Sequence, residues 1–297
     1  MQETEVIADQ PNDEYHATAA IGSSGLKLLK QSPLHYWARY LDPDRERDEP
    51  TPAMKLGSAV HTAVLEPAEF DARYVVMPEG IDGRSKDGKA LIAEIKASGK
   101  ETITAKDMKL IAGMQNAAYT HPRMRVLFAM PQRIIEQSMY WTDPETGVRC
   151  KMRPDFMLPP DTPGFPHGLL MDLKSTTDAG PDFARQVWNL DMLIQAAWYT
   201  DGFMQVYGTT EAPPFRWFAQ EKEPPYANKP YKAGADLIEY GRREYRKLLA
   251  IYAECLSTNE WPGYGIDSGD LELPGYAKRV VDNELNDESL EITYAAE

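Results

Sequence analysis

Apolar residues in the first half of the chain recur every three or four positions, which is the period of an amphipathic helix. Several of these segments begin at serine or proline, residues that can start a helix. The pattern predicts helices over residues 23–29, 33–40, 53–65, 106–119 and 122–129, and one more from residue 90. This part of the chain is therefore expected to be helical.

The middle of the chain changes to short apolar runs that are bounded by turns. The runs predict a three-stranded meander, with strands over residues 134–141, 149–158 and 168–174. Two longer helical patterns and one more strand follow, at residues 183–207, 235–257 and 215–220. This order predicts an α/β fold, in which helices flank a central mixed sheet and a helical N-terminal portion precedes it.

Residues 1–20 are polar and lack periodicity, which predicts a flexible arm. Residues 21–262 are expected to form one domain, and residues 263–297 an acidic tail. The chain has 297 residues, of which 42% are apolar, enough for a sizeable core. No run of about eighteen apolar residues occurs and the N-terminus is acidic, so we expect no membrane span or signal peptide, and a soluble, cytoplasmic protein.

The formal net charge of −14 argues against a protein that binds nucleic acid over its whole surface. The charge is unevenly placed, because residues 264–297 hold nine Asp or Glu against Lys278 and Arg279 and so carry half of the excess. A local basic groove therefore remains compatible with the composition.

The chemistry of the chain is concentrated in three residues of the predicted meander. Side chains alternate faces along a strand, so Asp172 and Lys174 point the same way. Asp155 lies seventeen positions before Asp172, next to Pro154, which marks a strand edge or bulge. Two converging carboxylates favour a hard cation such as Mg²⁺ or Mn²⁺, and a nearby lysine suits phosphodiester hydrolysis. Taken alone, Asp172-x-Lys174 also fits an ion pair on an edge strand.

Pro154-Asp155 with Asp172-x-Lys174 resembles the motif of the PD-(D/E)xK nuclease superfamily. Residues 57–61 and 195–199 match the G-x-x-x-H and Q-x-x-x-Y helices of its RecB-type branch. Further segments are similar to the nuclease domain of RecE exonucleases (exonuclease VIII) and related phage proteins, at residues 21–38, 136–155 and 215–226. The similarity spans about residues 20 to 262, and the motifs occur in the order of the family.

The resemblance implies a role for each motif residue. His61 would bind the metal together with Asp155 and Asp172, and the small Gly57 would let its helix approach the sheet. Lys174 would orient the attacking water or stabilise developing charge. Gln195 and Tyr199, one turn apart on a helix, would bind DNA phosphates or the catalytic lysine. Without the resemblance, His61 fits a core or surface residue, and Gln195 and Tyr199 fit a semi-buried helix face.

The resemblance also implies an activity and partners. Such enzymes use Mg²⁺, for which Mn²⁺ can substitute, to degrade the 5′ strand of linear double-stranded DNA from its ends and expose a 3′ single strand for recombination. They form ring-shaped homo-oligomers and act with a single-strand annealing protein of the RecT type. Two alternatives are a RecB-like nuclease acting on single-stranded DNA and a catalytically silent DNA-binding scaffold. Cys150 and Cys255 are too few for the iron-sulfur variety of RecB-like nuclease.

Further candidates for the site lie on the predicted strands. Glu136 could add a carboxylate to the metal site or bind Arg153, and the pattern leaves both open. Arg149, Lys151 and Arg153 share parity with Asp155, which predicts a basic strip on the active face that binds DNA.

Two further groups of residues could contact DNA outside the strands. Basic residues gather in a predicted loop that, with the basic strip, would line the channel of a ring: Arg84, Lys86 and Lys89. Aromatic residues, which could stack on a frayed DNA end or pack in the core, lie in the second helix: Tyr36, Trp37 and Tyr40.

Overall fold

The computed structural model describes residues 3–46, 49–78, 80–265, 270–275, 277–279 and 282. The chain divides into two compact units, Met1–Trp261 and Pro262–Glu297. Most of the acidic tail predicted at residues 263–297 lies outside the described residues. None of the helices in the described part of the chain combines the length and the hydropathy that crossing a membrane requires.

A five-stranded mixed sheet forms the centre of the first unit. Its strands lie in the spatial order β10-β9-β8-β7-β4. Their bounds are β4 (Ile134–Ile135), β7 (Phe156–Leu158), β8 (Leu169–Thr176), β9 (Phe215–Glu221) and β10 (Asn228–Lys232). β8 and β9 run parallel, and the other neighbours are antiparallel. The predicted α/β class with a central mixed sheet is confirmed.

Two smaller sheets complete the strand pairing. One is antiparallel, in the order β1-β5-β6, with β1 (Glu5–Ile7), β5 (Ser138–Thr142) and β6 (Arg149–Met152). The other pairs β2 (Tyr74–Val76) with β3 (Glu101–Ile103) in parallel. The chain passes directly from the first of these sheets into the central sheet, because β7 follows β6 in the sequence.

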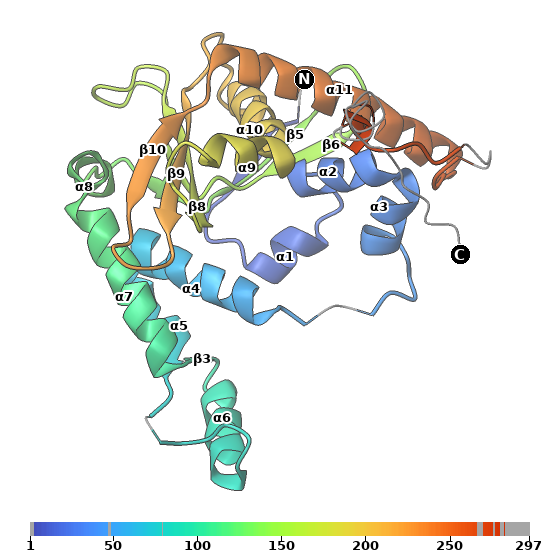
Figure 1. Ribbon diagram of the computed structural model, residues 1–297. Helices are drawn as coiled ribbons and strands as arrows, with labels where there is room; N and C mark the ends of the chain where they lie inside the picture. The colour runs from blue at the N-terminus through green and yellow to red at the C-terminus, as the bar shows by residue number, and fades with distance from the viewer. Residues whose placement is uncertain are drawn as a thin grey trace, which may run out of the picture. The chain divides into compact units, whose positions relative to one another are not determined.

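Helices cover the central sheet on both faces, as predicted. The N-terminal helices are α1 (Asn12–Ala17), α2 (Ser23–Gln31), α3 (Pro33–Tyr40), α4 (Pro52–Leu65), α5 (Phe70–Arg73), α6 (Lys86–Ala97), α7 (Ala105–Thr120) and α8 (Pro122–Phe128). The later ones are α9 (Phe183–Asn189), α10 (Met192–Tyr207) and α11 (Ala235–Thr258). Figure 1 shows α4 and α7 on one side of the sheet and α9 and α10 on the other.

The alternation of side chains along β8 separates two buried cores. Leu169, Met171 and Leu173 pack into the core that includes α4 and α7. Leu170 packs into the core on the opposite face, which includes α10 and α11. Asp172 shares the parity of Leu170 and therefore faces α10, at the border of the second core.

Two predicted strands are each broken into two, and the breaks place the candidate site. The run at 134–141 changes sheet at Glu136, whose φ of 45° is left-handed and ends β4. The run at 149–158 changes sheet between β6 and β7, at Arg153-Pro154-Asp155. Proline lacks the N–H that a continuous ladder would need, so the break falls there. Asp155 consequently stands at the entrance to β7.

Other elements also differ from the prediction. The long helix over 183–207 is broken into α9 and α10 at Asp191, whose φ of 50° a helix cannot include. β10 was not predicted because its sequence is polar and contains Pro230, a residue tolerated on an edge strand. Part of the arm predicted at residues 1–20 is instead placed in β1 and α1, because β1 pairs with β5.

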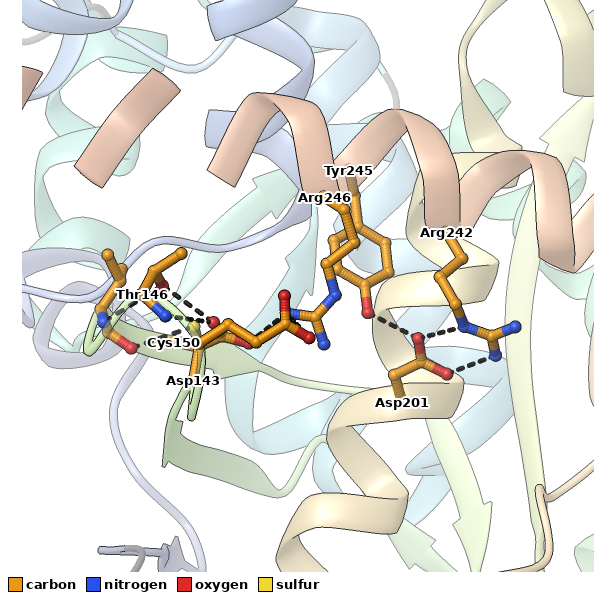
Figure 2. A network of polar contacts seen from close by, with 9 residues as sticks. Asp143, Thr146, Cys150, Asp201, Arg242, Tyr245 and Arg246 are labelled. Atoms are coloured by element: carbon orange, nitrogen blue, oxygen red, sulfur yellow. Dashed lines mark hydrogen bonds and ion pairs between the residues drawn. The ribbon is translucent and has the colours of Figure 1, made fainter. Parts of the chain in front are cut away.

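A network of charged side chains fastens α11 to its neighbours (Figure 2). Arg242 donates two hydrogen bonds to Asp201 of α10, at 2.7 and 2.6 Å, and the hydroxyl of Tyr245 donates a third to Asp201 at 2.5 Å. One turn further, Arg246 donates to Asp143, at the end of β5, at 2.5 Å. These contacts pair Asp201 and Asp143 with side chains of α11 and so connect this helix to α10 and to the end of β5.

Replacing Asp201 with alanine tests how much this network stabilises the fold. The change removes the acceptor of three hydrogen bonds and leaves Arg242 and Tyr245 without it. We expect the free energy of unfolding to fall by about 2 to 4 kcal/mol, measured by urea denaturation. Asp182→Ala, which removes an exposed ion pair with Arg185 at 3.7 Å, is the matched control and should cost less than about 1 kcal/mol. Equal effects of the two variants would contradict a structural role for the network.

Candidate active site

Asp172 lies at the centre of the site, on β8, with 1% of its surface exposed. The ammonium of Lys174 lies 2.9 Å from its Oδ1 and 2.7 Å from its Oδ2. Gln195, on the first turns of α10, donates from Nε2 to Oδ1 at 2.7 Å. The contact to Oδ2 has the distance of an ion pair but not hydrogen-bond geometry, so this buried oxygen accepts no hydrogen bond within the described part of the chain.

Asp155 faces the same site from the start of β7. Its Oδ2 accepts a hydrogen bond from the backbone N–H of Leu173 at 2.7 Å and lies 3.6 Å from Nδ1 of His61. Burial and then the negative charge of Asp172 raise the pKa of Asp155 to about 6, against the opposing charges of His61 and Lys174. The two carboxylates that the motif predicted therefore do share one electrostatic site.

The carboxylates of Asp155 and Asp172 also shift the pKa values of Lys174 and Tyr199. Burial alone would lower the pKa of Lys174, but the charges of Asp172 and Asp155 outweigh it and raise this pKa above its usual range. Lys174 therefore stays protonated. Burial and then the same two carboxylates raise the pKa of Tyr199 to about 12. The Tyr199 hydroxyl donates to the backbone oxygen of Arg153 at 3.2 Å.

The donors at the site suit a hard divalent cation. Asp155 and Asp172 present carboxylate oxygens, and Oδ2 of Asp172 is buried without a hydrogen bond. His61 lies next to Asp155, with its Nδ1 3.6 Å from Oδ2 of that carboxylate. Across the described residues, however, no three His, Cys, Asp or Glu side chains are grouped closely enough to hold an ion. The two carboxylates fit a cation, whereas the third ligand is not assembled around them.

Two neighbours of the site differ from expectation. A Cβ built on Gly57 would meet nothing within 4 Å, so this glycine is not what brings α4 close to the sheet. Glu136 lines cavities together with Asp155 and with His61. The guanidinium of Arg153 binds Ser138 and residues 10 and 12, so the pairing of Arg153 with Glu136 is not observed.

A cavity of about 550 Å³ opens beside Asp155 and Tyr199. Its wall includes side chains from α1, α2, α3 and β6, among them Tyr15, Ser24, Tyr40 and Lys151. Tyr36 also borders it but is 5% exposed and is hydrogen-bonded to Tyr252 at 3.2 Å, as expected for core packing.

The predicted DNA-contacting groups are not brought together. Arg149, Lys151 and Arg153 line the cavity, yet all three are bound by residues 3–18 of the same chain. Arg84 precedes α6, whereas Lys86 and Lys89 lie in the first turn of this helix and not in a loop. α6 packs against β3, and none of the residues that line the cavity comes from α6. Their common DNA channel remains a prediction.

The sequence suggested Lys27 of α2 as a possible DNA contact, but did not predict it as a neighbour of the metal motif. Burial and then the positive charge of Lys174 lower the pKa of Lys27 to about 8, while Asp172 and Asp191 oppose this shift. Lys27 therefore lies within the electrostatic field of the motif residues. Lys30, one turn later, pairs with Asp191 immediately before α10, which indicates that α2 lies against the start of that helix.

The fold and this site together define a protein of the PD-(D/E)xK nuclease fold, a class whose members generally use divalent metal ions. The chain belongs to the family described as "PDDEXK-like domain of unknown function (DUF3799)", which matches residues 22–273. Family and fold support a nuclease. A comparison with curated proteins finds no match.

Two solved structures are similar to this chain. One is a protein from Eubacterium rectale described as a putative exonuclease, with 14% identity, a TM-score of 0.59, and coverage of 92% of this chain and 96% of the other. This likeness shows the fold. The other is protein VC1899 from Vibrio cholerae, with 11% identity, 86% and 59% coverage, and a TM-score of 0.23, too low to support an argument.

The raised pKa of Asp155 predicts how the metal-free protein responds to pH. Because the folded state holds this proton more tightly, Asp155 contributes stability that is complete below its unfolded pKa, about 4, and is lost as the pH rises through about 6. Asp155→Asn, which cannot ionise, should therefore lose less stability than the wild type between about pH 4 and 7. Urea unfolding in EDTA measures this, and parallel curves for the two proteins would contradict it.

Proposed function

We propose that this protein is a Mg²⁺-dependent exodeoxyribonuclease similar to RecE. The observation that carries the proposal is the cluster of Asp155, Asp172 and Lys174, in which a half-buried and a fully buried carboxylate lie near one lysine that stays protonated. An ion pair on an edge strand, the alternative reading of the motif, would be exposed. Asp172 is instead buried on a central strand of the sheet.

The residues of the site suit phosphodiester hydrolysis. A bound divalent ion would be held by Asp155 and Asp172 and would supply Lewis acidity and an activated water. Lys174 places a fixed positive charge where negative charge develops on the scissile phosphate. Gln195 donates to Oδ1 of Asp172, while Oδ2 has no hydrogen bond and lies 2.7 Å from the ammonium of Lys174. Tyr199 fixes the backbone of Arg153, two residues before Asp155.

The finer parts of the proposal follow from the likeness to RecE. The enzyme would degrade the 5′ strand of linear double-stranded DNA from its ends and expose a 3′ single strand for recombination. It would work as a homo-oligomeric ring together with an annealing protein of the RecT type. In such a ring, Lys86 and Lys89 of α6 would face the DNA.

A second candidate is a RecB-like nuclease that acts on single-stranded DNA. The cavity beside Asp155, about 550 Å³, has the size of a site for one small ligand and is too small to enclose a duplex. A strand would have to be unpaired where it enters this cavity. Both candidates use the same motif residues, and they differ in whether the enzyme accepts a duplex end.

Digestion of DNA with and without Mg²⁺ tests the activity. We expect loss of linear duplex plasmid, no loss of circular plasmid, and no cleavage in EDTA. Asp172→Asn should reduce cleavage by at least about a hundredfold, because it removes a ligand charge without changing volume. Asp182→Asn, the same change at an exposed position, is the control. Cleavage of single strands alone would favour the second candidate, and no cleavage of any substrate would favour a scaffold.

His61 separates a ligand role from a packing role. Its side chain is 26% exposed and lies 3.6 Å from Asp155. His61→Ala should raise the Mg²⁺ concentration for half-maximal cleavage by about tenfold or more. The melting temperature of the metal-free protein should fall by no more than a few degrees, about 1 kcal/mol. A large loss of melting temperature with unchanged metal dependence would assign His61 to the core.

A further inference from the structure

The segment over residues 3–18 is held against β6 by the three cations of the basic strip. The segment contains five Asp or Glu residues and no Lys or Arg. Arg149 donates to the carboxylate of Glu5 at 2.6 Å, and Lys151 donates to the backbone oxygens of Tyr15 and Thr18 at 2.7 and 3.0 Å. The range matched by the family begins at residue 22, so this segment lies outside it.

Within this segment, Tyr15 lies against two cations of the basic strip. The guanidinium of Arg153 lies 4.1 Å from the centre of its ring, and the ammonium of Lys151 lies 4.8 Å from it. Both contacts are in the range of cation–π interactions. Burial and then the neighbouring Tyr199 raise the pKa of the Tyr15 hydroxyl. Tyr15 therefore packs on the basic strip, near enough to Tyr199 of α10 to interact with it electrostatically.

Arg153 is fixed on every side. Its Nε and Nη2 donate to the hydroxyl of Ser138 at 2.9 and 2.7 Å. Nη2 also donates to the backbone oxygen of Gln10 at 3.0 Å, and Nη1 to Asn12 at 3.4 Å. Its backbone oxygen accepts from Tyr199. The ring of Tyr15 supplies the remaining contact, on the face of the guanidinium.

The backbone transmits this constraint to Asp155. Only Pro154 separates Arg153 from Asp155, proline fixes its own φ, and it also restricts the residue before it. A fixed Arg153 therefore limits where the Asp155 carboxylate can stand. We propose that Tyr15 is a positioning residue for Asp155, acting through the guanidinium of Arg153. The proposal rests on the role of Asp155 in the proposed nuclease site.

Two substitutions at Tyr15 test the proposal in the full-length protein. Tyr15→Leu keeps an apolar side chain but removes the aromatic face, whereas Tyr15→Phe keeps the face. Mn²⁺ affinity is measured by titration without DNA, and kcat and KM are measured on linear duplex. Tyr15→Leu should weaken Mn²⁺ binding and lower kcat by about tenfold each, with KM unchanged, and Tyr15→Phe should restore both. The control is Tyr231→Leu on the edge strand β10, which removes a ring whose centre lies 4.8 Å from Lys229 and a hydroxyl that donates to the backbone oxygens of residues 179 and 180.

A purely structural role predicts a different result. It would lower the melting temperature and the fraction of active protein while leaving the Mn²⁺ affinity of the folded fraction unchanged, and that result overturns the proposal. A rise in KM alone would mean that the ring contacts DNA, and it overturns the proposal as well. If Tyr15→Leu does not fold, Arg153→Lys, which keeps the charge and loses the planar fork, should show the same loss of Mn²⁺ affinity.

The nuclease proposal and the positioning proposal fail separately. A wild-type protein that binds Mn²⁺ but cleaves nothing contradicts the nuclease, while the effect of Tyr15→Leu on Mn²⁺ affinity still decides the positioning role. A wild-type protein that cleaves DNA, with Tyr15→Leu binding Mn²⁺ equally well, contradicts only the positioning role. A wild-type protein that binds no Mn²⁺ overturns both.

Discussion

Two carboxylates held close together in a buried site are the constraint on which the rest of this site depends. Burial of Asp155 and the negative charge of Asp172 raise the free energy of the ionised form of Asp155. The fold offsets this with the backbone N–H of Leu173, which donates to Asp155, and with the amide of Gln195 and the ammonium of Lys174, which contact Asp172. The remaining imbalance appears in the raised pKa of Asp155, and a divalent cation would remove it.

The scaffold around this site brings its parts from separated segments. β8 provides Asp172 and Lys174 by alternation, and α10 provides Gln195 and Tyr199 one turn apart. The position of Asp155 depends on Pro154, where the chain passes from the β1-β5-β6 sheet to the central sheet. Because α10 is in turn fixed to α11 through Asp201, the network around Arg242 supports the helix that faces the site, although it lies outside the site itself.

The basic strip that the sequence predicted as a DNA contact has its partners within the folded protein. Arg149, Lys151 and Arg153 form the expected strip beside the candidate site, but their donors bind the acidic N-terminal segment. Cations that are satisfied within the molecule contribute less to binding a polyanion than free ones do. DNA binding by this acidic protein would therefore depend more on the divalent ion and on enclosure of the strand than on exposed basic side chains.

The sequence by itself determined the fold class, most of the helices and the face on which Asp172 and Lys174 stand, because helical periodicity and strand alternation are local properties of the backbone. It also marked Pro154 as a point where a strand must end or bend. It could not show that β4 and β5 belong to different sheets, that Asp191 breaks the long helix, or that the N-terminal segment packs on β6. The packing of the N-terminal segment depends on contacts between residues more than a hundred positions apart, such as Tyr15 with Arg153. The separation of β4 from β5 depends on the pairing of β4 with β7 and of β5 with β6. Only the tertiary structure decides such contacts, because the sequence around Tyr15 or Arg153 contains no local pattern that identifies the other residue as its partner.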